Sequence, residues 1–365
     1  MRPVVFTGDA FRIQSRGGIT RYFKETIARL SRPVEVLAGW HQSPALRTLA
    51  VPVREAAFVP HRRGLTRPRA LLNAAWDRGP LRDAARRGAI LHPTYYRDPR
   101  SLPRTSPVVA TVWDMTHERF AGLFRRRFWQ AADAARWKRA LCARADRIVC
   151  ISDATRRDLL ASVDVPEAKL HVIHAGAPDW TGIAARPMPA VPLPFFLWVG
   201  DRHGYKNFLP AMEAWAASAA GRATALLCVG GGPLSAEERD AAARCGALER
   251  VLHRAADDAE LRWAYERAAG LLYLSRSEGF GLPVLEAMSL GCPIVGSPAA
   301  ALPEVVGTLA ILADPEDRES MAAGIERCLE QGRTPEGAIA LRARAALFTW
   351  DRCAREHERV YEALD

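Results

Sequence analysis

The sequence predicts an α/β protein in which two Rossmann-like, doubly wound domains face a central cleft. Two observations support this prediction. The 365 residues exceed what one ordinary hydrophobic core organises and suit two domains of roughly 150 to 200 residues. Short β-branched and apolar runs alternate with helical segments along the whole chain, which is typical of parallel sheets with crossover helices.

The predicted strands occur in two groups. The first group reads PVVFTG, VEVLAG, AILHP, PVVATVW, RIVCIS and KLHVIHAG, and the second reads FFLWVG, ATALLCVGG, GLLYLS and CPIVGS. Between the groups, residues 186–194 read RPMPAVPLP, and four prolines in nine residues disfavour both a helix and a central strand. We therefore predict an N-terminal domain over residues 1–185 and a C-terminal domain over residues 186–348.

The last segment, residues 349–365, is predicted to be a helix that crosses back to the first domain. Its residues Trp350, Cys353, His357, Val360 and Tyr361 are spaced near one helical face. Two doubly wound sheets that face each other would bring their strand C-termini and helix N-termini to one cleft, which is where α/β proteins usually bind ligands.

Composition excludes several classes of protein. The seven cysteines are scattered without a C-x-x-C pair, which argues against a zinc site or a disulfide framework and favours a reducing compartment. The start MRPVVFTGDAFRI has no apolar signal region. The longest uncharged stretch, residues 287–303, is interrupted by Gly, Pro and Ser, so it makes a poor membrane span. We expect a cytoplasmic protein, soluble or peripheral on the inner face of the cell membrane.

The charge is divided unequally between the two halves. Residues 1–185 carry 32 Lys+Arg and 16 Asp+Glu, whereas residues 186–365 carry 19 and 25. Such asymmetry fits an anionic partner, but no nucleic-acid-binding motif is present. An anionic membrane and a plain solvated surface both explain the two basic segments, which contain Arg62, Arg63, Arg67 and Arg69, and Arg125, Arg126 and Arg127.

Three stretches bear residues suited to a phosphorylated sugar ligand. Gly17 and Gly18 enter the first helix, where they form a plain turn or let a ligand approach free backbone N–H groups. Arg202 and Lys206 follow a buried strand, either as a solvated pair or as a fork and a point charge for a diphosphate.

The third stretch, SEGFGLPVLEAM, contains two carboxylates. Pro283 is a good first helical residue, so Glu278 lies in a loop and Glu286 lies one turn into the following helix. A carboxylate there can accept two vicinal hydroxyls, as in a ribose, or can simply complement the helix dipole.

These stretches together resemble glycosyltransferase family 4, the retaining transferases of the GT-B fold. The resemblance rests on SEGFGLPVLEAM and on five further motifs in the family's order: GGITRYF, LHPTYY, CISDATRRDLL, VIHAGAP and VGDRHGYKN. It implies that Arg202 and Lys206 clamp the donor diphosphate as catalytic residues. Glu278 would contact the transferred sugar and Glu286 the ribose, with donor contacts from Gly17, Gly18, Asn207, Gly279, Phe280, Gly281 and Leu282.

One motif departs from the usual pattern. ATVWDMTHERF has Trp113 where many relatives have histidine, and this branch resembles bacterial polysaccharide mannosyltransferases. Asp114 and His117 are then the candidates for the acceptor or sugar side. No D-x-D occurs in the chain, so the carboxylate pair that commonly binds a metal–diphosphate complex is missing. We expect no metal and no cofactor, with the cations and a helix dipole in place of Mg²⁺.

The resemblance implies a retaining hexosyltransferase of bacterial surface polysaccharide synthesis. The expected donor is a nucleotide-diphosphate sugar, with GDP-mannose or a GDP-deoxysugar favoured over UDP- or ADP-glucose. The expected acceptor is a glycan or a lipid-linked glycan, and no nucleic acid is expected as partner. A nucleotide-sugar epimerase of the same architecture is the alternative.

Overall fold

The computed structural model describes residues 1–60, 66–124 and 129–365. The chain divides into unit 1, which is Met1–Gly176 with Thr349–Asp365, and unit 2, which is Ala177–Phe348. The division lies after residue 176 rather than after residue 185, because residues 177–185 pack within unit 2, where Trp180 Nε1 donates to Ser289 Oγ at 2.9 Å. No helix of the described ranges has the length and apolar character needed to cross a bilayer.

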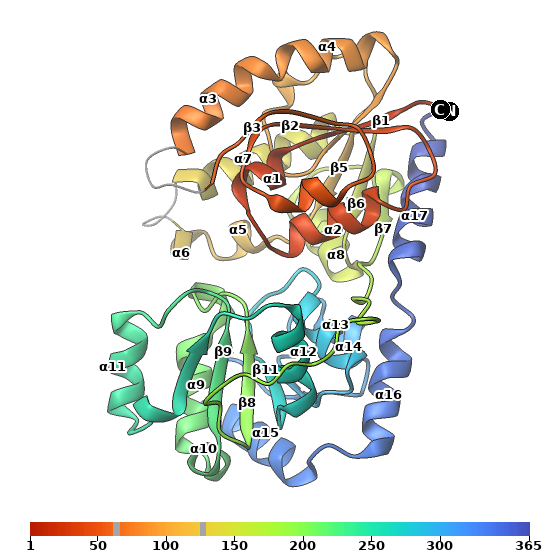
Figure 1. Ribbon diagram of the computed structural model, residues 1–365. Helices are drawn as coiled ribbons and strands as arrows, with labels where there is room; N and C mark the ends of the chain where they lie inside the picture. Colours follow the sequence, from red (N-terminus) through yellow and green to blue (C-terminus); the bar gives the residue numbers. More distant parts are fainter. Residues whose placement is uncertain (61–65, 125–128) are drawn as a thin grey trace. The chain divides into compact units, whose positions relative to one another are not determined.

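The strands of unit 1 are all parallel (Figure 1). Four form a sheet in the order β3-β2-β1-β4 and three form a sheet in the order β5-β6-β7, with a bridge between Leu91 and Val108 at the junction. Their bounds are β1 Val4–Thr7, β2 Val34–His41, β3 Val53–Phe58, β4 Ile90–Pro93, β5 Val109–Val112, β6 Arg147–Cys150 and β7 Leu170–Val172.

Helix α17 (Trp350–Glu362) packs within unit 1 against α2 (Gly18–Ile27). The Tyr22 ring meets the Trp350 ring edge-on at 5.9 Å, and the apolar stripe seen in the sequence is buried. The other helices are α1 Asp9–Ile13, α3 Thr66–Trp76, α4 Arg78–Arg86, α5 Thr116–Arg119, α6 Ala121–Phe124, α7 Trp129–Arg144 and α8 Asp153–Ser162.

Unit 2 has one parallel sheet in the order β10-β9-β8-β11-β12-β13. In chain order this is 3-2-1-4-5-6, the doubly wound arrangement, with its switch point between β8 and β11. The bounds are β8 Phe195–Val199, β9 Ala225–Val229, β10 Val251–Arg254, β11 Gly270–Tyr273, β12 Ile294–Gly296 and β13 Ile311–Leu312. The strands β3, β10 and β13 were absent from the sequence prediction, and all three are at sheet edges.

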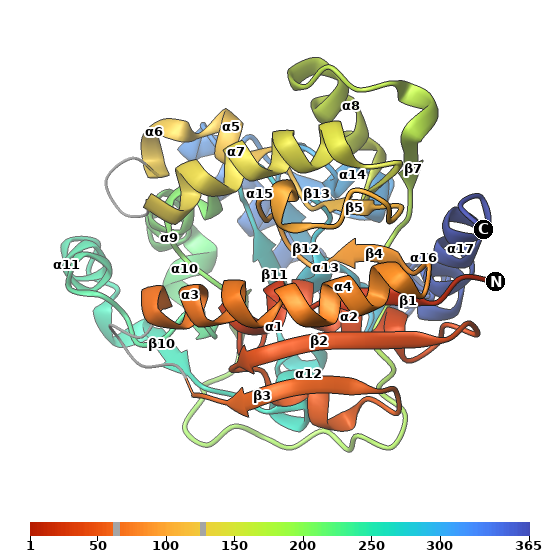
Figure 2. The same cartoon turned by 90° about the horizontal axis from the view of Figure 1, so that it is seen from above.

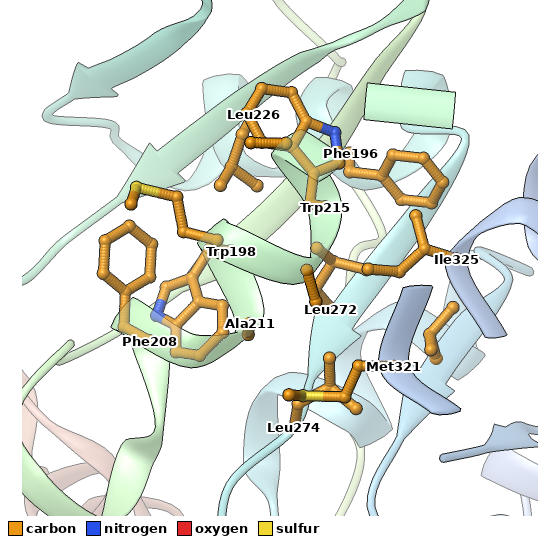
Figure 3. Close-up of a cluster of buried hydrophobic side chains, with 14 of the residues drawn as sticks. Phe196, Trp198, Phe208, Ala211, Trp215, Leu226, Leu272, Leu274, Met321 and Ile325 are labelled. Carbon is orange, nitrogen blue, oxygen red and sulfur yellow. The ribbon is translucent and has the colours of Figure 1, made fainter. Parts of the chain in front are cut away.

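The core of unit 2 fixes β8 against its following helix. Trp198 of β8 packs on Phe208 and Ala211 of α9, while Met321 and Ile325 of α15 lie on the same side (Figure 3). Both flanks of the intervening loop are therefore anchored by buried apolar surface. The helices are α9 Phe208–Ala217, α10 Ala219–Ala223, α11 Ala236–Arg244, α12 Asp258–Arg267, α13 Leu282–Ser289, α14 Leu302–Val306, α15 Arg318–Gln331 and α16 Pro335–Ala345.

Candidate active site

Two loops meet at the switch point of unit 2. One follows β8 and the other follows β11, and they are joined by a backbone bond from Arg276 N to Tyr205 O of 2.8 Å. Lys206 Nζ, from the first loop, donates to both carboxylate oxygens of Glu278, from the second, at 2.8 and 3.0 Å. The structure thus brings together two predicted site residues where doubly wound sheets bind ligands.

The surroundings of Lys206 make it a fixed cation. Its side chain is 21% exposed and its ammonium lies over the rings of Tyr205 and Tyr273, 5.2 and 5.9 Å from their centroids. Burial would lower the pKa of Lys206, but the charge of Glu278 and the two tyrosines outweigh burial and raise this pKa well above its usual range. Burial, with Glu278, also raises the pKa of Tyr273, so its phenol stays neutral.

Arg202 is not part of this pair. Its side chain is 1% exposed and its Nε donates to Glu238 Oε1 at 2.8 Å. Nη1 donates to Gly230 O and Nη2 to Gly232 O, at 2.9 and 2.8 Å. The guanidinium therefore ties the loop after β8 to the glycine loop after β9. Direct contact of Arg202 with a diphosphate remains a prediction.

The glycine turn before α13 depends on its backbone conformation. Gly281 is the N-cap of α13 and has φ +95°. Residues other than glycine rarely adopt this value, because their Cβ would clash with the backbone. Phe280 is buried edge-on against Phe348, with ring centroids 5.8 Å apart. The backbone of the predicted donor loop, which includes Gly279 and leads to Leu282 as the first residue of α13, is thereby fixed.

Asn207 shapes the loop that bears Lys206. It has φ +64° at the N-cap of α9, and its Nδ2 donates to Pro315 O at 2.7 Å. The side chain is buried. Asn207 therefore positions the end of the loop, and a contact with the donor remains a prediction.

The two carboxylates of SEGFGLPVLEAM lie on different elements, as their sequence positions indicated. Glu286 is within α13 and only 6% exposed, and its Oε2 accepts a hydrogen bond of 2.7 Å from Tyr265 of α12. Glu278 is in the loop with Lys206. The two carboxylates therefore have separate partners and can serve separate parts of a ligand.

In unit 1 the predicted residues lie at two places. Gly17 caps α2 and Gly18 begins it, both exposed and without a side-chain cap. Asp114 follows β5, and its Oδ1 accepts a 2.8 Å bond from Thr116 N. His117 lies in α5, and burial lowers the pKa of its imidazole, so it is neutral at pH 7.

One residue of this region was missed in the sequence. Lys138 of α7 is fully buried, and its Nζ donates to Asp114 O and Glu118 Oε2, both at 2.7 Å. It therefore anchors the loop that bears Asp114. The signal was available, because Lys138 lies in the same helical stripe as the buried Ala134 and Leu141.

The two predicted basic segments are described only in part. Arg62, Arg63 and Arg125–Arg127 lie outside the described residues, and nothing is stated for the side chain of Arg67. Arg69 is buried, and its Nη2 donates to Arg12 O at 2.8 Å. The expectation that Arg69 belongs to a solvent-facing basic surface was wrong, because the structure uses it to satisfy a backbone carbonyl.

A hollow of ≈ 400 Å³ lies elsewhere in unit 2, lined in part by Pro293, Ile311, Arg333 and Leu341. Pro293 precedes β12 and Ile311 begins β13, so the hollow is at the amino ends of these strands. It is separate from the loops that bear Lys206 and Glu278.

Comparison with known proteins gives matches to both units. Residues 16–179 match the family described as Glycosyltransferase Family 4, and residues 194–331 match Glycosyl transferases group 1. HepE of Anabaena, solved in complex with UDP and glucose, has a TM-score of 0.74 at 17% identity over 98% of this chain and 99% of that one. The fold is therefore that of the GT-B glycosyltransferases.

Curated relatives agree with this class. O-antigen chain mannosyltransferase B of Escherichia coli is 41% identical over 29% of this chain and 28% of its own. MMP alpha-(1->4)-mannosyltransferase of Mycolicibacterium hassiacum is 27% identical over 70% of this chain and 65% of its own. GDP-mannose:cellobiosyl-diphosphopolyprenol alpha-mannosyltransferase of Komagataeibacter xylinus is 34% identical over 36% of this chain and 35% of its own. The matches span less than two thirds of each relative. Residues 16–179 thus match a Glycosyltransferase Family 4 domain and residues 194–331 match a Glycosyl transferases group 1 domain.

Proposed function

We propose that the protein transfers a hexose, mannose or a related deoxysugar, from a GDP-linked donor to a glycan or lipid-linked glycan in bacterial surface polysaccharide synthesis. The observation that supports this most directly is the pair of Lys206 and Glu278 at the switch point of unit 2. The choice of sugar follows the relatives, three of which are named as mannosyltransferases.

In this proposal the donor diphosphate replaces Glu278 as the partner of Lys206. The freed carboxylate then accepts hydrogen bonds from hydroxyls of the transferred sugar, while Glu286, next to Tyr265, binds the ribose. Arg202 supports the site by holding the loop of Gly230 and Gly232.

Transfer with retention is proposed to occur by front-face attack. The bond from the anomeric carbon to the phosphate oxygen breaks, and a bond to the acceptor oxygen forms on the same face. The acceptor proton passes to the departing phosphate oxygen, whose charge Lys206 stabilises. No metal is needed in this scheme, so a chelator should leave the rate unchanged, and loss of transfer with EDTA would contradict it.

The test is transfer measured with GDP-mannose, UDP-glucose and ADP-glucose in parallel. Lys206→Ala should reduce turnover by roughly 100-fold or more, as for other preorganised charge contacts, with the melting temperature little changed. Lys24→Ala, at a half-exposed lysine of α2, is the matched control. If Lys206→Ala transferred sugar at the wild-type rate, the assignment of the site would be wrong.

A second candidate is a UDP-glucose donor, which the HepE complex with UDP and glucose favours. The donor panel decides between the two nucleotides. Analysis of the product from labelled donor separates transfer from epimerisation, because an epimerase leaves the sugar on the nucleotide.

A further inference from the structure

Helix α3 presents its two described polar side chains, those of Arg69 and Asn73, to the protein. Asn73 is buried and bonds both backbone groups of Trp40 in β2, since its Oδ1 accepts from Trp40 N at 2.9 Å and its Nδ2 donates to Trp40 O at 3.0 Å. Arg69, one turn earlier, is buried, and its Nη2 donates to Arg12 O. Asp77, one turn later, accepts from Arg12 Nη2 at 2.7 Å. The inward stripe therefore has polar side chains with bonded partners at Arg69 and Asn73, and ends in Trp76, which packs against the core of unit 1.

The outward side of α3 is apolar. Leu71 is 74% exposed and Leu72 is 50% exposed, and Ala70, Ala74 and Ala75 are exposed beside them. A surface helix of a globular protein normally has the opposite arrangement. Adjacent exposed apolar side chains indicate a surface that contacts another apolar phase.

Helix α4 extends the outward side of α3 and carries positively charged side chains there. Figures 1 and 2 show α3 and α4 end to end along one side of unit 1. Leu71, Ala75, Arg78, Arg82 and Arg86 are separated by steps of three and four residues, which keeps them on one helical face. The three arginines are exposed. We call these five residues with Leu72 the α3–α4 outer face.

Little negative charge opposes these arginines. Among the described residues of the α3–α4 segment the acidic ones are Asp77 and Asp83. Asp77 is buried against Arg12, and Asp83 is half-exposed and pairs with Arg86 at 3.3 Å. The exposed charge of the outer face is therefore predominantly positive.

We propose that the α3–α4 outer face docks the protein on an anionic lipid bilayer. The leucines need an apolar phase and the arginines need anionic groups within one helix length of it, and the boundary between lipid head groups and acyl chains offers both. A second copy of this chain would bring the same arginines without exposed acidic partners. This inference is independent of the donor sugar and rests on unit 1 alone.

The experiment is flotation of the full chain with vesicles of phosphatidylcholine, with or without an equal part of phosphatidylglycerol. Wild type should bind the anionic vesicles, and added salt should weaken binding. Arg78→Gln/Arg82→Gln/Arg86→Gln should lower the partition coefficient about 100-fold, at about fivefold per arginine. Leu71→Gln/Leu72→Gln should lower it by roughly tenfold or more.

Matched controls lie elsewhere on the protein. Ile339→Gln/Leu347→Gln removes two exposed apolar side chains of unit 2, which are 61% and 55% exposed. Arg244→Gln/Arg355→Gln/Arg359→Gln removes three exposed helical arginines. Both controls should bind vesicles as wild type does. Every altered side chain is exposed, so melting temperatures should also be unchanged.

Three results would overturn the proposal. The first is equal vesicle binding by wild type and both outer-face variants, and the second is binding that does not depend on phosphatidylglycerol. The third is a wild-type dimer in sedimentation velocity that Leu71→Gln/Leu72→Gln abolishes while no form of the protein floats with vesicles. The third result would assign the face to self-association.

Discussion

Two buried histidines predict that unit 1 loses stability in mild acid. His357 of α17 is fully buried, its Nδ1 donates to Cys353 O at 2.9 Å, and its Nε2 accepts from Tyr22 OH at 3.4 Å. Burial lowers the pKa of His357 to about 4. His92 of β4 is equally buried, between Tyr361 and Thr111, and burial lowers its pKa well below the usual range.

The direction and size follow from proton linkage. The unfolded chain takes up a proton on each histidine near pH 6.5, whereas folded His357 stays neutral until about pH 4, so stability falls as pH drops through this window. Between pH 7 and pH 5, His357 alone should reduce the free energy of unfolding by about 2 kcal/mol. His92 acts in the same direction.

The assay is urea unfolding of the full chain at pH 7 and pH 5. His357→Gln keeps a hydrogen-bond donor but has no titrating proton, so its loss between the two pH values should be about 2 kcal/mol smaller than that of wild type. His203→Gln, at an exposed histidine, should leave the loss unchanged.

An undiminished loss in His357→Gln would refute this reasoning. If that variant is already unfolded at pH 7, NMR titration of wild-type His357 decides instead. A pKa of about 4 is expected from this titration. A pKa of about 6.5, the ordinary value for histidine, would contradict the burial argument.

Three further predictions concern unit 2. Glu278→Gln removes the charge that offsets burial of Lys206, so the pKa of Lys206 should fall and the alkaline limit of activity should move to lower pH in a rate profile. Arg202→Met should cost about 3–5 kcal/mol in urea unfolding by leaving Glu238 without its buried partner, whereas Arg202→Met/Glu238→Leu should recover most of this loss. Gly281→Ala should cost about 1–2 kcal/mol because φ there is +95°, and calorimetry should show it; an unchanged melting temperature would mean that the turn relaxes.

The sequence was sufficient for the central strands and for the edge strand β7, and insufficient for the edge strands β3, β10 and β13. Central strands such as β8 and β9 are buried on both faces, so they read as apolar runs. Edge strand β3 carries Arg54 and Glu55, and β10 ends in His253 and Arg254. Charged side chains protect such edges from unwanted pairing, and the same charges remove the apolar pattern by which strands are recognised.

The candidate site shows a similar division. Lys206 and Glu278 could be placed together because each follows a strand at the switch point. Arg202 is only four residues from Lys206, yet its partner Glu238 is 36 residues away in α11. A guanidinium in a loop looks the same in a sequence whether it faces a ligand or a buried carboxylate. Proximity in sequence therefore predicted the location of Arg202 but not its contacts.

Helix α3 gives the physical reason why a hydrophobic pattern can mislead about which side of a helix is buried. Pairing of β2 with β3 shifts register around Gly39 and Trp40, and the Trp40 N–H and C=O are bonded by the Asn73 amide. Gly39 has φ +60°, and a Cβ there would lie 2.2 Å from Asn73 Oδ1, so this approach of helix to strand requires glycine. Leaving such backbone groups unpaired would cost about 1–3 kcal/mol each, comparable to the gain from burying a leucine. The local geometry of β2 thus turns the polar side of α3 inward, and the leucines are left for a partner outside the fold.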